Sequence, residues 1–112
     1  MKQIEKLPDR NSTNLAEHMR PELFKALCDP VRISIVATLA MKAQPVTVSE
    51  ITGCCGIDFS GVSRHLKLLR DAGVVAAEKR GREMLYTLKT DELIETLHGL
   101  ADVLGSFKKA AA

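Results

Sequence analysis

Three cysteines are the side chains of this 112-residue sequence with the most distinctive chemistry. Cys54 and Cys55 are adjacent, Gly53 and Gly56 flank them, and Cys28 lies upstream. Thiolates bind soft ions and metalloids such as arsenite, Hg(II), Cd(II) and Cu(I). Neighbouring side chains on a regular helix point about 100° apart, so the pair can share one ion only where the helix end unwinds, which flanking glycines favour. The pair is therefore a candidate effector site, with Cys28 or a residue of a second subunit as third ligand.

Two other interpretations of the cysteines stay open. A disulfide between neighbouring residues closes a strained, easily reduced ring, which suits a redox switch. Cys28 can instead form a disulfide with Cys54 or Cys55, or oxidation can stop at the sulfenate. The cysteines can equally be structural, because cysteine is among the most buried residue types and Cys55 is in helical phase with Val48 and Ile51. Three cysteines do not make the framework of a disulfide-rich secreted domain.

Positive charge is the second chemical feature, and it is concentrated in one stretch. The net charge of the whole chain is only +2. Residues 58–89, however, hold seven Lys or Arg against four Asp or Glu, whereas residues 90–112 hold two against four. We expect contacts with nucleic-acid phosphates in the positive stretch.

Two short helices are predicted around the cysteine pair and the start of this stretch. Thr47 and Glu50 form a capping box that opens the first helix, and Gly56 ends it. Asp58 caps the second helix, which Gly73 closes. We expect its apolar side chains to face inward: Phe59, Val62, Leu66 and Leu69. Two such helices joined by a tight turn indicate a helix-turn-helix.

A β-hairpin is predicted directly after these helices. Strand-like runs at residues 74–78 and 83–88 flank the basic turn at residues 79–82. A helix-turn-helix followed by a basic hairpin is the layout of a winged helix, whose second helix enters the DNA major groove. The predicted DNA contacts on that helix are Ser60, Gly61, Ser63, Arg64, His65 and Lys67, and those on the wing are Lys79, Arg80 and Arg82.

Different chemistry is expected from the members of this set. Ser and Arg side chains can hydrogen-bond base edges, and Lys67 suits a phosphate. Gly61 would allow close approach to DNA. His65 either contacts DNA or shapes the helix surface, and no second metal ligand follows it three or four residues later.

Further helices are predicted on both sides of the winged helix. Residues 1–13 are polar and are expected to form a flexible arm, and a domain is expected at residues 14–109. A first helix starts near Asn14 with Leu15 and Met19 inward, and a shared apolar face follows at Leu23, Phe24 and Leu27. Asp29-Pro30 begins another helix, which ends at Gln44-Pro45. Its apolar residues at helical spacing are Ile33, Val36, Leu39 and Ala40. From Asp91 a last helix carries a heptad-like seam of Leu93, Leu97, Leu100, Leu104 and Phe107.

The sequence as a whole resembles the ArsR/SmtB repressors over about residues 15–105. The resemblance lies in residues 24–32 (FKALCDPVR), in residues 62–75 (VSRHLKLLRDAGVV) and in residues 79–82 (KRGR) leading into Leu85-Tyr86. It implies a homodimer joined through the first and last helices. It also implies repression of a nearby operon, relieved when an effector binds.

The effector sites known in that family are not matched here. The Cys-x-Cys-x-x-Cys box of its arsenic- and cadmium-responsive members aligns with residues 47–52 (TVSEIT), which contain no cysteine. Its zinc-responsive members place Asp and His ligands on the last helix, where this sequence offers Asp91, His98 and Asp102 without the paired histidines that such a site needs. We therefore predict neither site.

These observations together predict a mainly α-helical winged helix-turn-helix of about five helices with a β-hairpin wing. The expected function is that of a cytoplasmic, homodimeric repressor that binds double-stranded operator DNA without a cofactor. A thiol-reactive inducer, a soft metal or metalloid such as arsenite, would release it. We expect no signal peptide, because the first 20 residues are polar. We also expect no membrane-spanning helix, because the apolar run at residues 33–41 is shorter than the roughly 20 residues that span a bilayer.

Two alternative functions predict different properties. A small thiol enzyme using Cys54 or Cys55 with His65 or His98 lacks an orienting partner at a recognisable spacing, so we expect no enzyme. A winged helix used only for protein contacts predicts instead that Arg64→Ala and Arg82→Ala leave DNA affinity unchanged.

Overall fold

The computed structural model describes residues 20–111, apart from the side chains of Cys54, Cys55 and Ala111. The predicted arm at residues 1–13 and the predicted helix start near Asn14, with Leu15 and Met19, lie outside these residues. The described chain contains two compact units, which we describe separately. One is Glu22–Thr90, and the other contains Arg20, Pro21 and the residues from Asp91 on.

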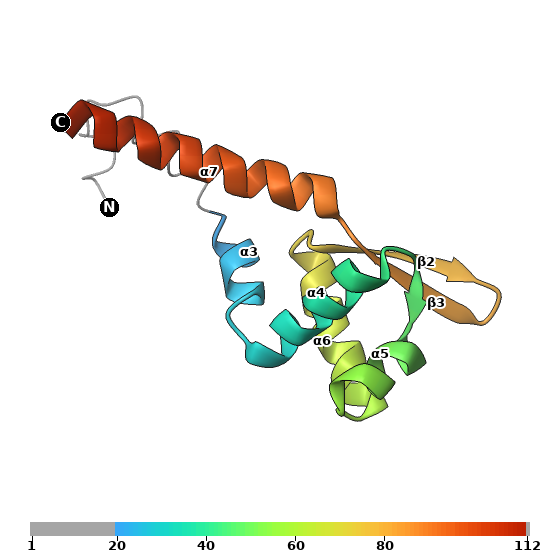
Figure 1. The fold of residues 1–112 in the computed structure, drawn as a ribbon. Helices are drawn as coiled ribbons and strands as arrows, with labels where there is room; N and C mark the ends of the chain where they lie inside the picture. Colours follow the sequence, from blue (N-terminus) through green and yellow to red (C-terminus); the bar gives the residue numbers. More distant parts are fainter. Residues whose placement is uncertain (1–19, 112) are drawn as a thin grey trace. The chain divides into compact units, whose positions relative to one another are not determined.

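Five helices and three strands follow one another within residues 20–111. They are α3 (Pro21–Ala26), α4 (Pro30–Lys42), β1 (Val46–Thr47), α5 (Val48–Cys55), α6 (Phe59–Asp71), β2 (Val75–Arg80), β3 (Glu83–Leu88) and α7 (Thr90–Ala111). This order is the winged helix that the sequence predicts, with α5 and α6 as the helix-turn-helix and β2–β3 as the wing (Figure 1).

The signals that begin and end α4 act as predicted, but its buried face is shifted. The Asp29 side chain accepts a hydrogen bond from the Val31 amide at 2.8 Å, and the helix ends at Lys42. Ile35 and Leu39 are buried, whereas Ile33, which we expected inward, is 47% exposed. Spacings of three and four residues fit more than one stripe on this largely apolar helix, and only its neighbours select the stripe that is buried.

Both ends of α5 and the C-terminal end of α6 also follow the sequence. In the capping box Thr47 N donates to Glu50 Oε1 at 2.8 Å, and Glu50 N donates to Thr47 Oγ1 at 3.3 Å. Gly56 ends α5 in a left-handed conformation that costs a residue with a Cβ about 1–2 kcal/mol. At the end of α6, Gly73 N donates to Arg70 O at 3.0 Å and Val74 N donates to Leu69 O at 2.9 Å. These two bonds are those of a Schellman motif.

The wing belongs to a three-stranded antiparallel sheet of order β1-β3-β2. Strand β1, which the sequence did not reveal, pairs Val46 with Tyr86 and Thr47 with Leu85. The predicted four-residue turn at 79–82 is too long, because Lys79 and Arg80 belong to β2 and Arg80 pairs with Glu83. Only Gly81 and Arg82 remain in the turn. The positive φ of Gly81 (61°) allows this two-residue connection between right-handedly twisted strands.

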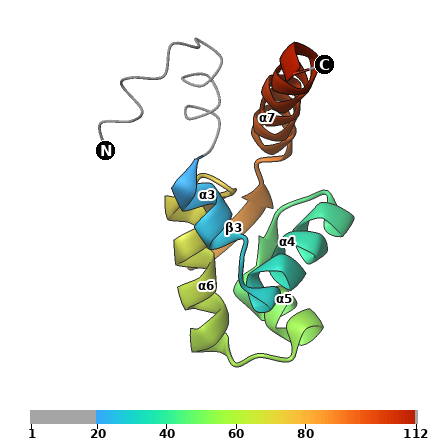
Figure 2. The ribbon, with the colours of Figure 1, turned by 90° about the vertical axis from the view of Figure 1, so that its left-hand side faces the viewer.

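The core of the Glu22–Thr90 unit lies where the helices meet the sheet. Helix α4 packs against α5, α6 and β3, and α6 also packs against β2 (Figures 1 and 2). The largest fully buried side chains are Leu23, Ile35, Val46, Ile51, Val62, Leu66, Leu69, Val74 and Val75. Phe59, which we expected among them, is instead 58% exposed. It is the first residue of α6, and the side chains of this helix enter the core only from Val62 onward.

Helix α7 is the predicted last helix and begins at Thr90. At the start of the described chain, Arg20 Nη1 donates to Thr96 Oγ1 at 3.2 Å. Leu97 and Leu104 of the predicted seam are 43% and 51% exposed. None of the helices within residues 20–111 combines the length and apolar character needed to cross a membrane.

Candidate nucleic-acid interface

The outer face of α6 is set by the burial of its inner face. Val62, Leu66 and Leu69 have no exposed surface. On the opposite side lie four of the predicted DNA contacts, of which Ser63 is half-buried and the others are exposed: Ser60, Ser63, Arg64 and Lys67. Serine and arginine can hydrogen-bond base edges, and Arg can bind guanine O6 and N7 together. The helix therefore presents these groups without breaking any core contact.

Lys67 is engaged, but only by a weak surface contact. Its Nζ lies 3.1 Å from Asp71 Oδ2, four residues later on the same helix, and both side chains are largely exposed. Such exposed pairs contribute about 0.3–0.5 kcal/mol, which is less than the charge-assisted bonds available to a phosphate. Lys67 can thus exchange its carboxylate partner for DNA.

Gly61 does not lie on the outer face, so that part of the sequence interpretation is wrong. It is buried in the first turn of α6. A Cβ at this position would lie 2.8 Å from Asp58 Oδ1 and 2.9 Å from Ile57 Cγ2. Glycine is needed here because the turn between α5 and α6 packs against the first turn of α6, and this close packing is internal to the protein.

Asp58 stands at the N-cap of α6, but its side chain makes no capping hydrogen bond. Instead Ser60 Oγ donates to Asp58 Oδ2 at 2.7 Å. This bond lowers the pKa of the Asp58 carboxyl below its usual value, because it stabilises the ionised form. A carboxylate at this end of the helix also complements the positive end of the helix dipole.

His65 is half-buried and faces α4 with one ring nitrogen. Its Nδ1 lies 3.2 Å from Arg32 Nη1. Because a guanidinium only donates hydrogen bonds, Nδ1 must be the acceptor, which places the proton of the neutral ring on Nε2. This nitrogen of His65 is therefore engaged inside the protein, in agreement with a role in shaping the surface of α6.

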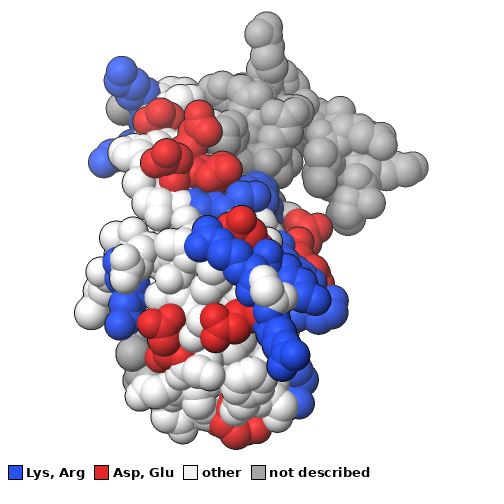
Figure 3. Space-filling view, turned by 90° about the vertical axis from the view of Figure 1, so that its right-hand side faces the viewer, with Lys and Arg blue, Asp and Glu red and all other residues white. Residues whose placement is uncertain are grey.

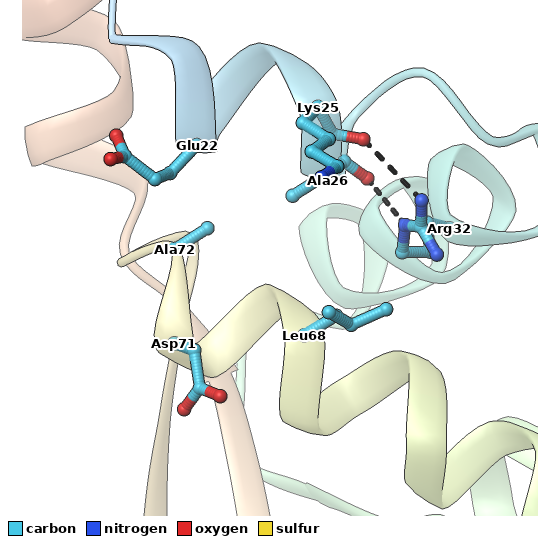
Figure 4. Close-up of a pocket in the computed structure, with 7 residues that line it drawn as sticks. All are labelled: Glu22, Lys25, Ala26, Arg32, Leu68, Asp71 and Ala72. Carbon is cyan, nitrogen blue, oxygen red and sulfur yellow. Dashed lines mark hydrogen bonds between the residues drawn. The ribbon is translucent and has the colours of Figure 1, made fainter.

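Arg32, which the sequence analysis overlooked, links three helices. Its Nε donates to Ala26 O at 2.6 Å and its Nη2 to Lys25 O at 3.3 Å (Figure 4). Its Nη1 also lies 3.5 Å from Asp29 Oδ2, and the side chain is 12% exposed. The carbonyl groups at the end of α3 lack partners within their own helix; Arg32 donates to those of Lys25 and Ala26 while it holds His65 of α6. The only signal in the sequence is the position of Arg32 in the first turn after Asp29-Pro30.

The same three helices enclose a shallow hollow of about 220 Å³ beside Arg32 (Figure 4). Its apolar lining includes Ala26, Leu68 and Ala72. The carboxylates of Glu22 and Asp71 border it, but they point away from one another. This hollow therefore brings together no set of groups suited to catalysis.

The wing adds the remaining predicted cations. Lys79, Arg80 and Arg82 are all exposed, and Arg80 Nη2 makes only an exposed contact of 3.4 Å with Glu78 Oε1. On the face towards which the hairpin points, Lys and Arg side chains gather in an oblique band (Figure 3). These cations lie where they can follow a DNA backbone.

Helix α6 and the wing border one surface hollow of about 250 Å³. Ser63 of α6 and Arg82 of the wing turn both line it. Ser49 and Phe59 line it as well, and sequence reasoning missed both. Ser49 follows the Thr47 cap by two residues, so its exposed position could have been inferred from the capping box. The two predicted DNA-binding elements thus form one continuous surface.

The structure does not test the predicted effector site. Cys54 and Cys55 occupy the last turn of α5, but their side chains are outside the described part of the chain. Cys28 is an exposed, free thiol whose Sγ donates to Lys25 O at 3.0 Å. Among the side chains that are described, His, Cys, Asp and Glu form no group of three or more that could hold a metal ion.

Comparison with known proteins gives the same fold and one functional class. Residues 27–77 match the family model described as a helix-turn-helix domain. The chain is 32% identical over 88 residues to the uncharacterized HTH-type transcriptional regulator YceK of Bacillus subtilis, covering 79% of this chain and 88% of YceK. It is 30% identical over 97 residues to a transcriptional repressor SmtB homolog of Synechocystis, covering 87% and 71%. An ArsR-like transcriptional regulator from Rhodococcus shares the fold, with a TM-score of 0.71 and 24% identity over 88% of this chain and 87% of that one.

The burial of Gly61 can be tested against Gly53. We expect Gly61→Ala to lower the free energy of unfolding by about 1–3 kcal/mol, because the added methyl group overpacks the turn. A Cβ at Gly53 would meet nothing within 4 Å, so Gly53→Ala should leave stability unchanged or raise it by up to about 1 kcal/mol. Urea denaturation of both variants measures the difference. If the Gly61→Ala protein has unchanged stability but weakened DNA binding, Gly61 faces the DNA as the sequence suggested.

Proposed function

Because this chain belongs to the ArsR/SmtB family of helix-turn-helix transcriptional regulators, we propose that it represses transcription by placing α6 in the major groove of an operator. The observation that best supports this proposal is that the apolar face of α6 is buried, while Ser60, Arg64 and Lys67 are exposed beside the wing. The family is a non-enzymatic class of DNA-binding proteins, so the prediction that the chain is no enzyme is confirmed.

The proposed contacts divide into two kinds. Ser60, Ser63 and Arg64 would hydrogen-bond base edges in the major groove, which is about 12 Å wide and admits a helix. Lys67 and the wing cations Lys79, Arg80 and Arg82 would neutralise phosphates and fix the register of the protein on DNA. No cofactor is needed for either kind of contact.

Arg64 and Arg82 test this division. Arg64→Ala should weaken binding by about 1–3 kcal/mol and relax sequence preference, because a hydrogen-bond donor to a base edge is removed. Arg82→Ala should weaken binding to all sequences alike and reduce the slope of log K against log salt by about 1, because one phosphate is no longer neutralised. Fluorescence anisotropy at several salt concentrations measures both, on a duplex that the protein itself selects from a randomised pool.

Lys42→Ala, which removes an exposed cation at the end of α4, is the matched control and should bind as wild type does. If the two Arg variants also bind as wild type does, the winged helix serves protein contacts instead of DNA.

We further propose that two copies of the chain pair through α7, as the family resemblance implies for the last helix. The support is the apolar seam of α7, on which Leu97 and Leu104 are 43% and 51% exposed in the single chain. Burial of apolar surface contributes roughly 25 cal/mol per Å², so packing this seam against the seam of a second copy would be favourable. The pair would present two α6 helices to half-sites about 34 Å apart, one helical turn of DNA.

Leu97→Glu combined with Leu104→Glu tests the pairing. Two buried carboxylates would oppose association, so we expect a monomer by analytical ultracentrifugation. Operator affinity should fall by about 100-fold or more, since binding to the second half-site is no longer intramolecular. Glu95→Ala, on the same helix, is the control and should remain a dimer. A double variant that stays dimeric places the interface elsewhere.

For the inducer, we propose a thiol-reactive agent acting at Cys54 and Cys55, with a soft metal or metalloid such as arsenite as the leading candidate and an oxidant or reactive sulfur as the alternative. The support is positional. Only Gly56, Ile57 and Asp58 separate the cysteine pair from the first residue of α6. Ligation or oxidation at the end of α5 would therefore move α6 without a long relay.

The double variant Cys54→Ser with Cys55→Ser tests this site. We expect it to bind the operator as wild type does, because neither side chain is among the proposed DNA contacts, and to resist release by the inducer. The measurement is anisotropy of the operator complex titrated with arsenite, Hg(II), Cd(II), Cu(I), Zn(II), peroxide and persulfide. Cys28→Ser, tested alone, shows whether that thiol is the third ligand. A double variant still released by every agent that releases wild type would put the switch at another site.

A further inference from the structure

Phe59 is an aromatic side chain on the surface that we assign to DNA. It is 58% exposed and is the most exposed aromatic residue of the described chain. Single exposed apolar residues are common on protein surfaces, but this one is not isolated. It lines the hollow between α6 and the wing, where Met84 and Tyr86 are further apolar lining residues beside the charged Arg82 and Glu83.

The position of Phe59 on α6 aligns it with the proposed contacts. Phe59, Ser63 and Lys67 are spaced four residues apart, and residues at this spacing lie on the same face of a helix. Phe59 is also the first residue of the helix. In helix-turn-helix proteins the N-terminal residues of the recognition helix are the ones that contact base edges. Phe59 therefore stands at the end of the DNA-facing stripe that reaches the bases.

The chemistry of the ring restricts what it can contact there. Phenylalanine has no hydrogen-bonding group, so it cannot bind a phosphate or the donor and acceptor atoms of a base edge. The apolar group that the major groove presents is the C5-methyl group of thymine. Arg82, which lines the same hollow, can bind a phosphate and so keep the ring close to the base edges.

We propose that Phe59 is a specificity-determining residue that packs against a thymine methyl group in each operator half-site and so selects thymine over cytosine there. This inference rests on the proposed function. Burying one methyl group is worth about a fourfold change in affinity for each half-site. The ring thus supplies sequence selection that does not depend on charge.

Replacing thymine by deoxyuridine, which removes only the methyl group, tests the proposal. On the duplex selected by the wild-type protein, each thymine pair related by the half-site symmetry is replaced in turn. The affinity of wild type should fall about fourfold per half-site at one such position, and Phe59→Ala should be indifferent to that replacement. Met41→Ala removes another exposed apolar side chain, outside the hollow, and should keep the wild-type pattern. Phe59→Leu should retain part of the sensitivity.

Three results separate the possible failures. If wild type is indifferent to every deoxyuridine, or if Phe59→Ala keeps the wild-type sensitivity, the role of Phe59 is wrong while DNA binding stands. If wild type selects no duplex and binds none in low salt, the proposed function itself fails. Unfolding curves of Phe59→Ala should match those of wild type, since the exposed ring contributes little to the core.

Discussion

The arrangement of this molecule depends on the burial of three side chains on one side of α6. Val62, Leu66 and Leu69 have no exposed surface, and burying each is worth roughly 1.5–3 kcal/mol. Successive residues on a helix are turned by about 100°, so a slip of one position would expose this face and bury charged groups. The rotation of α6 about its axis is thus fixed, and the outward position of Arg64 and Lys67 follows from it.

Burial alone does not fix where α6 lies relative to its neighbours, and short-range contacts supply the rest. At its start, Gly61 allows the turn from α5 to pack against the first turn of α6. In its middle, His65 meets Arg32, which also holds the last carbonyl groups of α3. The helix is therefore restrained at two points in addition to its apolar face. A protein that must place side chains against base edges needs this restraint, because hydrogen bonds weaken steeply as their geometry departs from the optimum.

How much of this could be predicted depended on whether the determinants are local. The capping box at Thr47 and the glycine ends of α5 and α6 are set within a few residues, and the sequence predicted them correctly. Phe59 was placed inward because it extends the apolar period of α6, yet periodicity does not show where the core ends. Strand β1 is two residues long and exists only through its pairing with β3. The contact between Arg32 and His65 joins residues 33 positions apart in the sequence, and no local pattern predicts it.

The cysteine pair stands in the last turn of α5, directly before the turn into α6. Helix α5 has eight residues, and helices this short are marginal without tertiary support. Its first half has that support from the capping box and from buried Val48 and Ile51. The described contacts that hold its end are backbone bonds such as Gly56 N to Thr52 O at 3.1 Å, each worth about 1 kcal/mol. In the proposed switch, a bond formed by a thiolate would outweigh such contacts, and the end of α5 would rearrange while its anchored half stays in place. Because α6 starts shortly after α5 ends, that rearrangement would act first on the turn that positions Phe59 and Ser60.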